Sequence, residues 1–282
     1  MVFFLKTINT HKRDKNISFE EKTHTYTIRT KNRKRDTSFT SVTTWVHSLF
    51  PRFNPDKVIE NMMKSAKWSE NKYFGKTAEE IKSLWKENGT QAAIAGTKMH
   101  NDIERYYNHE TVEDPDSTEF KYFLDFEKDR TKDPKNDMML PYRTEWTVYD
   151  EELKLSGSID MIYEYKDSGI LVIYDWKRCK EIKKTNTWEH ANVKEIEHLP
   201  NTNYWHYALQ LNTYREILER NYDKQVKELW LVCLHPNKVG YEKIHVPILK
   251  EEMENLFRIR KESFMQTQSD NKNNRYIDSG LS

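Results

Sequence analysis

An apolar run that ends in three unlike residues, Ile170–Lys177, constrains the fold of this chain more than any other stretch. Side chains alternate between the two faces of a β-strand, so Asp175 and Lys177 emerge on one side and Trp176 on the other. The run therefore predicts a strand that presents a carboxylate and an ammonium on the same surface. For this stretch alone, a surface salt bridge on an ordinary strand is the alternative.

A second predicted strand precedes this run. Leu155–Tyr163 has the pattern of a strand, and the short connection Lys166–Gly169 predicts that the two strands form a hairpin. Asp160 then lies beside Asp175. Two carboxylates and Lys177 at the end of a sheet are what a hard divalent cation and an activated water need.

Composition leaves the class of partner open. The 282-residue chain has 46 Lys plus Arg against 45 Asp plus Glu, a net charge of +1, so any nucleic-acid surface has to come from local segregation of charge. The length allows one large domain, or one domain with a smaller lobe. The two cysteines, Cys179 and Cys233, favour a reducing compartment and exclude a four-cysteine zinc or iron–sulfur site within the chain.

The chain carries no sequence signal for a membrane. The apolar run within Met1–Lys6 is too short for a signal peptide, and no stretch of about 18 apolar residues exists for a membrane span. We therefore expect a soluble intracellular protein without a membrane partner. The sequence does not distinguish the nucleus, cytoplasm or mitochondrion of a host cell.

Residues 1–89 are expected to form an accessory lobe, a hairpin followed by helices. Ser18–Phe19 and Thr25–Ile28 flank a turn-like segment and predict the hairpin. At the other end, residues 269–282 are expected to be a flexible tail, because Gln266–Asn274 are nearly all polar. The helices of the lobe are expected from Ser41 or Thr43 to Pro51, from Asn54 to about Trp68, and from the capping box of Thr77 and Glu80 to Asn88–Gly89.

Residues 90–268 are expected to form an α/β core. Three strands in sequence, then a helical crossover into a fourth, imply a mixed sheet with helices on its faces. The hydrophobic pattern predicts helices to about Asn108 and over Ser117–Lys132, strands near 142–149, 154–164 and 170–177, a helix over Tyr204–Arg220, a strand over Val226–His235 and a final helix from Leu249.

Two of these helices present polar side chains on one face. His100 and Glu104 lie one turn apart, and Tyr207, Gln210 and Tyr214 stand at i, i+3 and i+7. Taken singly, His100 and Glu104 can also be exposed helix residues. The two tyrosines can also be amphipathic core residues, with Gln210 as a hydrogen-bonded buried amide.

Four short motifs follow one another in the order helix, strand, strand, helix. They are Gly-Thr-x-x-His-x-x-x-Glu from Gly96, Ser-Gly-x-x-Asp ending at Asp160, Asp-Trp-Lys at 175–177, and Gln-x-x-x-Tyr from Gln210. Together they resemble the RecB-type, lambda-exonuclease-like branch of the PD-(D/E)XK nuclease superfamily, over about residues 90–235. Segments such as 39–43 and 198–204 look most like nucleases of phages and large DNA viruses.

The resemblance implies a restriction-endonuclease-like core and a metal-dependent DNA nuclease. An exonuclease acting in DNA repair, recombination or replication processing is the first expectation. By the same resemblance, Asp160, Asp175, His100 and the backbone carbonyl of Trp176 would hold one or two Mg²⁺ or Mn²⁺ ions. Lys177 would orient or deprotonate the attacking water and stabilise the developing charge.

The resemblance gives other side chains supporting roles. Gln210, Tyr214 and Tyr207 would hold the substrate strand or brace the site. Glu104, counted among the catalytic candidates, and Glu145 would bind a metal through water or support the metal-binding histidine.

The chain departs from the family at two points. Asp175 stands where many relatives carry Glu, and the cysteines that clamp an iron–sulfur cluster in some relatives are absent, so no cluster is expected. The loop after the third strand carries Lys180, Lys183, Lys184 and Trp188, which are candidates to track a phosphate backbone and stack a base. A solvated loop is the alternative.

Two other functions remain open at this point. One is a structure-selective or single-strand endonuclease acting on DNA or RNA. The other is a nucleic-acid-binding protein whose acidic cluster holds structural Ca²⁺ or no ion, which predicts salt-sensitive binding without cleavage. DNA, single-stranded or duplex with ends, is the expected partner, and a single-strand annealing or replication protein is a candidate partner.

Overall fold

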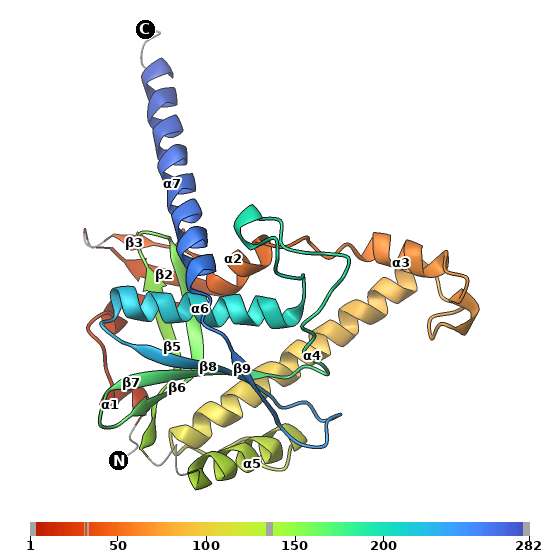
Figure 1. The fold of residues 1–282 in the computed structure, drawn as a ribbon, viewed down its shortest axis with the longest axis horizontal. Coiled ribbons are helices and arrows are strands. Elements are labelled where there is room, and N and C mark those ends of the chain that lie inside the picture. Colours follow the sequence, from red (N-terminus) through yellow and green to blue (C-terminus); the bar gives the residue numbers. More distant parts are fainter. Residues whose placement is uncertain (1–3, 31, 33, 134–137, 279–282) are drawn as a thin grey trace.

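A six-stranded mixed sheet forms the centre of the molecule (Figure 1). The structure is a computed structural model and describes residues 4–30, 32, 34–133 and 138–278. β6 and β7 are antiparallel, while β7 and β8 are parallel and joined through α6, so the predicted hairpin and helical crossover are both confirmed. The strands are, in spatial order, β4 (Thr40–Ser41), β6 (Leu155–Tyr165), β7 (Ile170–Lys177), β8 (Val226–Cys233) and β9 (Glu242–Val246), with β5 (Met139–Asp150) paired to β6.

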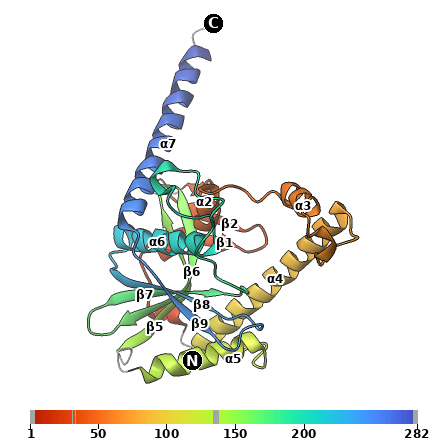
Figure 2. The ribbon, with the colours of Figure 1, turned by 45° about the vertical axis from the view of Figure 1, so that its right-hand side comes forward.

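Helices cover both faces of this sheet (Figures 1 and 2). On one face lie α2 (Val42–Ser48), α6 (Asn203–Asn221) and α7 (Lys250–Asp278), and on the other lie α5 (Thr118–Lys132) and the C-terminal half of α4 (Ala78–Tyr107). Successive side chains of β7 point to opposite faces: Leu171 and Ile173 pack in the core on the α6 side, and Val172, Tyr174 and Trp176 in the core on the α5 side. The predicted α/β fold with a mixed sheet is thus confirmed.

The N-terminal segment joins the same core. It begins with α1 (Leu5–Ile8) and a three-stranded antiparallel sheet of β1 (Ile17–Glu20), β2 (Thr25–Arg29) and β3 (Arg35–Asp36), which confirms the predicted hairpin. β4 then pairs in parallel with β6. Ile28, Val42 and Trp45 are buried in the core cluster that also contains Val148 of β5. Residues before 89 therefore complete the main sheet and its core.

One predicted helix boundary is wrong. The capping box of Thr77 and Glu80 starts α4 as expected, but the helix continues through Asn88–Gly89 to Tyr107, so the domain boundary expected at residue 89 lies inside a helix. A helical Gly costs only about 1 kcal/mol relative to Ala. Thirty residues of continuous helix overcome that cost.

Other boundaries differ in smaller ways. α3 (Pro55–Met63) begins at the predicted cap, Asn54, but ends before Trp68, where a short 3-10 turn follows. β9 was not predicted, because its five residues, Glu-Lys-Ile-His-Val, carry only two apolar side chains. α7 extends to Asp278 through most of the expected tail, which contains no Gly or Pro before that point; residues 279–282 lie outside the described part. No helix in the described residues is both long and apolar enough to span a membrane.

Candidate active site

Three polar side chains from three elements meet beside the end of β7. His100 comes from α4, Glu145 from β5 and Asp160 from β6, and one ligand atom of each lies within 4.8 Å of the others. α4 crosses this end of the sheet (Figure 1), and Nε2 of His100 lies 3.1 Å from the carbonyl oxygen of Trp176. We call His100, Glu145 and Asp160 the metal cluster.

An irregularity in β5 positions Glu145. Its backbone φ is 41°, a left-handed conformation that is uncommon for a residue with a side chain. Oε1 of Glu145 lies 3.4 Å from Nδ1 of His100, and Oε2 accepts a 2.9 Å hydrogen bond from the hydroxyl of Ser158. Both carboxylate oxygens are therefore held toward β6 and α4.

Backbone and imidazole groups fix Asp160. The backbone N–H of Trp176 donates a 2.9 Å hydrogen bond to Oδ2 of Asp160, and Nδ1 of His100 lies 3.6 Å from the same oxygen. Burial raises the pKa of Asp160, with a further contribution from Glu145, while His100 opposes the rise. Burial lowers the pKa of His100, but Asp160 and Glu145 outweigh it and raise this pKa to about 9. The two carboxylates thus favour the protonated imidazole, and a metal ion bound among them would take the place of that proton.

Asp175 and Lys177 form a buried ion pair next to the metal cluster. Nζ of Lys177 lies 2.5 Å from Oδ2 of Asp175 and 4.6 Å from the ring centroid of Tyr207 on α6. The side chain of Trp176 points to the opposite face and contacts Phe126, as strand alternation predicts. Burial raises the pKa of Asp175 to about 7 against the opposing charge of Lys177. Burial lowers the pKa of Lys177, but Asp175 and Asp160 outweigh it and raise this pKa.

The polar face of α6 closes the site from one side. Nε2 of Gln210 donates a 3.4 Å hydrogen bond to the hydroxyl of Tyr214. A Cβ atom at Gly157 would lie 2.7 Å from the hydroxyl of Tyr214, so only glycine fits there. The glycine of the Ser-Gly-x-x-Asp motif thus allows Tyr214, which is 2% exposed, to pack directly against β6.

The remaining predicted site residues have different positions. Glu104 lies one turn beyond His100 on α4, and burial, followed by the charge of Glu145, raises its pKa to about 7. The described interactions do not join the loop residues to the metal cluster: Lys183 lies 3.7 Å from Glu181, Lys184 lies over the ring of Tyr204, and Trp188 is 91% exposed. The side chain of Lys180 is exposed in the same loop.

Sequence reasoning missed two residues near the metal cluster. Ser158 stands two positions before Asp160 in the strand motif, and its hydroxyl holds Glu145. Strand alternation could have identified it, because positions i and i+2 share a face. Tyr26 of β2 is buried, and the charges of Glu145 and Asp160 contribute to raising its pKa. No local signal marks Tyr26, since its proximity depends on the packing of the N-terminal sheet.

A comparison with protein-family models identifies the family to which the chain belongs. The model of the PD-(D/E)XK nuclease superfamily matches residues 35–274. The chain belongs to the PD-(D/E)XK nuclease superfamily. Its mixed sheet with flanking helices is accordingly the restriction-endonuclease-like fold. The matched range includes every candidate site residue and extends across residue 89, so it also contains α2, α3 and α4.

Solved structures are more distantly similar. The crystal structure of a provisionally assigned exonuclease from Eubacterium rectale shares 14% identity at a TM-score of 0.38, and the match covers 61% of this chain and 65% of that one. The chain therefore spans slightly less than two thirds of that protein. The crystal structure of SSO0001 shares 14% identity at a TM-score of 0.31, with 83% of this chain and 79% of that one covered. No curated protein matches the chain.

The donor set of the cluster fits a divalent cation, as expected of a nuclease superfamily whose members depend on divalent metals. Two carboxylates and one imidazole supply oxygen and nitrogen ligands, and hard cations such as Mg²⁺ and Mn²⁺ prefer carboxylate oxygens. Asp175 is 2% exposed, and it lies next to Asp160 across the hairpin of β6 and β7. A bound cation would compensate the negative charge that this burial concentrates.

Proposed function

We propose that the protein is a Mg²⁺- or Mn²⁺-dependent deoxyribonuclease of the RecB-type, lambda-exonuclease-like branch, and that it acts as an exonuclease. The observation that carries the proposal is the convergence of His100, Glu145 and Asp160 beside the buried pair of Asp175 and Lys177. A nucleic-acid-binding module needs no such combination of buried carboxylates with an ammonium.

Each side chain has a chemical role in the proposed hydrolysis. His100, Glu145 and Asp160 would hold the metal, with Asp175 and the carbonyl oxygen of Trp176 as further oxygen ligands. The metal would supply a water of lowered pKa and neutralise charge on the scissile phosphate. Lys177, held by Asp175, would orient the attacking water and donate hydrogen bonds to the phosphate oxygens as negative charge develops.

The neighbouring residues keep this arrangement rigid. Ser158 fixes the carboxylate of Glu145, and the Trp176 N–H fixes that of Asp160. The ring of Tyr207 faces the Lys177 ammonium, which limits the directions in which Lys177 can point. Gln210 borders the same space from α6 and would contact the substrate strand, while Tyr214, buried against Gly157, would brace the site by holding Gln210.

Cleavage assays with matched variants test the proposal. End-labelled linear duplex, linear single strand and closed circular DNA are incubated with wild type, Lys177→Gln and Lys166→Ala, in Mg²⁺, Mn²⁺ or EDTA. We expect metal-dependent loss of the linear substrates alone, absent in Lys177→Gln and unchanged in Lys166→Ala, whose exposed side chain lies at the other end of β7. Cleavage of the closed circles would show that the enzyme is an endonuclease and not an exonuclease. Cleavage by Lys177→Gln would overturn the catalytic role assigned to Lys177.

A further inference from the structure

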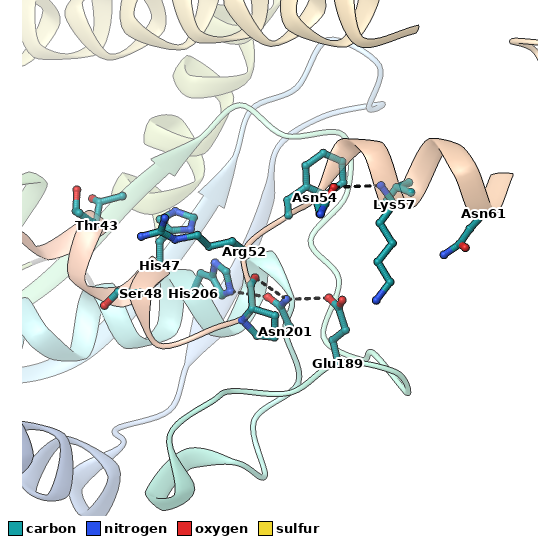
Figure 3. A pocket seen from close by; sticks show the side chains of 14 residues that line it. Thr43, His47, Ser48, Arg52, Asn54, Lys57, Asn61, Glu189, Asn201 and His206 are labelled. Carbon is teal, nitrogen blue, oxygen red and sulfur yellow. Dashed lines mark hydrogen bonds between the residues drawn. The ribbon is translucent and has the colours of Figure 1, made fainter. Parts of the chain in front are cut away.

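A cavity of about 1130 Å³ lies beside α2, apart from the metal cluster. One wall is the segment from the end of α2 to the first turns of α3, and the other is the loop before α6 with His206. Figure 3 shows Arg52 beside His47, and Lys57 extending from α3 toward the loop that carries Glu189. None of the residues of the metal cluster lines this cavity.

The charges of the cavity wall favour an anion. Arg52 and Lys57 have no ion pair with a carboxylate among the described residues, while the one lining carboxylate, Glu189, accepts a 3.0 Å hydrogen bond from Asn201. Burial lowers the pKa of His47, and burial lowers that of His206 to about 4. Both imidazoles are therefore neutral near pH 7, and the wall has two cations against one anion.

Exposed aromatic rings border this cavity and its neighbour. Phe53 lines the cavity and is 69% exposed. A second cavity of about 590 Å³ shares Asn201 with the first and is bordered by Trp188, which is 91% exposed. Cations together with open aromatic faces are the combination that binds unpaired nucleic-acid strands, because bases can stack on the rings while the backbone contacts the cations. A duplex keeps its base faces stacked inside and cannot use these rings.

The helix α6 connects the cavity to the metal cluster. His206 lines the cavity, and the ring of the next residue, Tyr207, lies 4.6 Å from Nζ of Lys177. Gln210 is one turn beyond His206 on the same side of the helix. The first turns of α6 therefore border both the cavity and the space beside Lys177.

We infer that this cavity, with Arg52, Lys57 and Phe53 as its contacts, is a binding site for an unpaired nucleic-acid strand several nucleotides from the scissile phosphate. The inference rests on the proposed nuclease function and adds the substrate class, a single strand. A strand too short to reach from Lys177 to Arg52 gains no affinity from the cavity. A longer strand binds more tightly because it contacts both places.

Binding of oligothymidylates of about 4 and about 16 nucleotides, measured by fluorescence anisotropy in EDTA, tests this site separately from cleavage. We expect Arg52→Ala/Lys57→Ala to bind the long strand at least about fivefold more weakly, with a salt slope reduced by about 1.4, and to bind the short strand unchanged. Phe53→Ala should weaken binding of the long strand by about fivefold or more without changing the salt slope. The control, Lys166→Ala/Lys227→Ala, alters exposed lysines at the far end of β7 and should bind like wild type.

The outcomes separate this inference from the proposed function. Wild-type binding of the long strand by Arg52→Ala/Lys57→Ala would overturn the inference even if the protein cleaves DNA. An equal loss of affinity for short and long strands in this variant would also overturn the inference. So would tighter binding of duplex than of single strand by the wild type. Conversely, a protein that cleaves nothing but binds the long strand through Arg52 and Lys57 would keep the site and lose the proposed nuclease function.

Discussion

Nζ of Lys177 lies 2.5 Å from Oδ2 of Asp175, and their side chains are 16% and 3% exposed. Burying an ion pair costs desolvation energy that the mutual attraction roughly repays, so the pair adds little net stability. Removal of one partner is different, because it leaves a charge buried without compensation. The relationship therefore couples the proposed catalytic function of Lys177 to the stability of the fold.

A double-mutant cycle measures this coupling. We expect Lys177→Met to lower the free energy of unfolding by about 3 kcal/mol, because Asp175 is left beside Asp160 without its counter-ion. Asp175→Asn/Lys177→Met should lose less than the sum of the two single variants, although all three should be inactive. Urea unfolding in EDTA gives the four free energies, and strictly additive losses would show that the pair is not coupled.

Metal affinity should depend on Glu145 and on the serine that holds it. Glu145→Gln should weaken Mn²⁺ binding by about tenfold or more, because one of three clustered ligands loses its charge. Ser158→Ala should have a smaller effect in the same direction, since it only frees the carboxylate of Glu145. Titration calorimetry with Mn²⁺ measures both, and Glu164→Gln, at the other end of β6, is the matched control. Unchanged affinity in Glu145→Gln would remove this residue from the ligand set.

Sequence patterns predict the parts of the fold that depend on residues close together in the chain. Alternation in Ile170–Lys177 gives β7 and the shared face of Asp175 and Lys177, and the hydrophobic pattern gives α6 and β8. The placement of Glu145 could not be predicted, because it depends on a residue with φ of 41° within β5. Tyr26 comes near enough to feel the charges of Glu145 and Asp160 only through the packing of the N-terminal sheet, so no sequence spacing marks it.

Gly157 should not tolerate a side chain. Its added Cβ would lie 2.7 Å from the ring of Tyr214, which is buried and cannot move aside, so Gly157→Ala should cost about 1–3 kcal/mol and most of the cleavage activity. Gly96→Ala, on the helix that carries His100, is the control: nothing lies within 4 Å of its added Cβ. Thermal unfolding and cleavage rates measure both variants. A fully active, stable Gly157→Ala protein would contradict the close contact with Tyr214.

Acid should release β3 from the β5–β6 turn. Burial acts to raise the pKa of Asp36, but hydrogen bonds from Lys154 and Ser38 outweigh it and lower this pKa from 3.8 to about 2. The unfolded chain thus binds a proton more readily, so the stabilisation is complete above pH 3.8 and is lost as the pH falls toward 2.

The size of this effect is limited by the partial exposure of the pair. We expect Asp36→Asn to lose about 1 kcal/mol at pH 7, and the difference from wild type to shrink between pH 5 and pH 3, by denaturant unfolding at each pH. Asp223→Asn is the control, because its ion pair with Lys12 is fully solvent-exposed. A difference that grows as the pH falls would contradict the sign of the pKa shift.

The continuity of α4 through Gly89 gives opposite expectations for two glycines. Gly89 is helical with no neighbour within 4 Å of an added Cβ, so Gly89→Ala should stabilise the helix by about 0.5–1 kcal/mol. Gly75, just before the helix, has φ of 83°, so Gly75→Ala should instead strain the backbone and destabilise it. Amide hydrogen exchange over residues 80–95 measures both changes locally. If the helix ended at Asn88–Gly89 with a left-handed glycine, as the sequence alone predicts, Gly89→Ala would speed exchange as Gly75→Ala does.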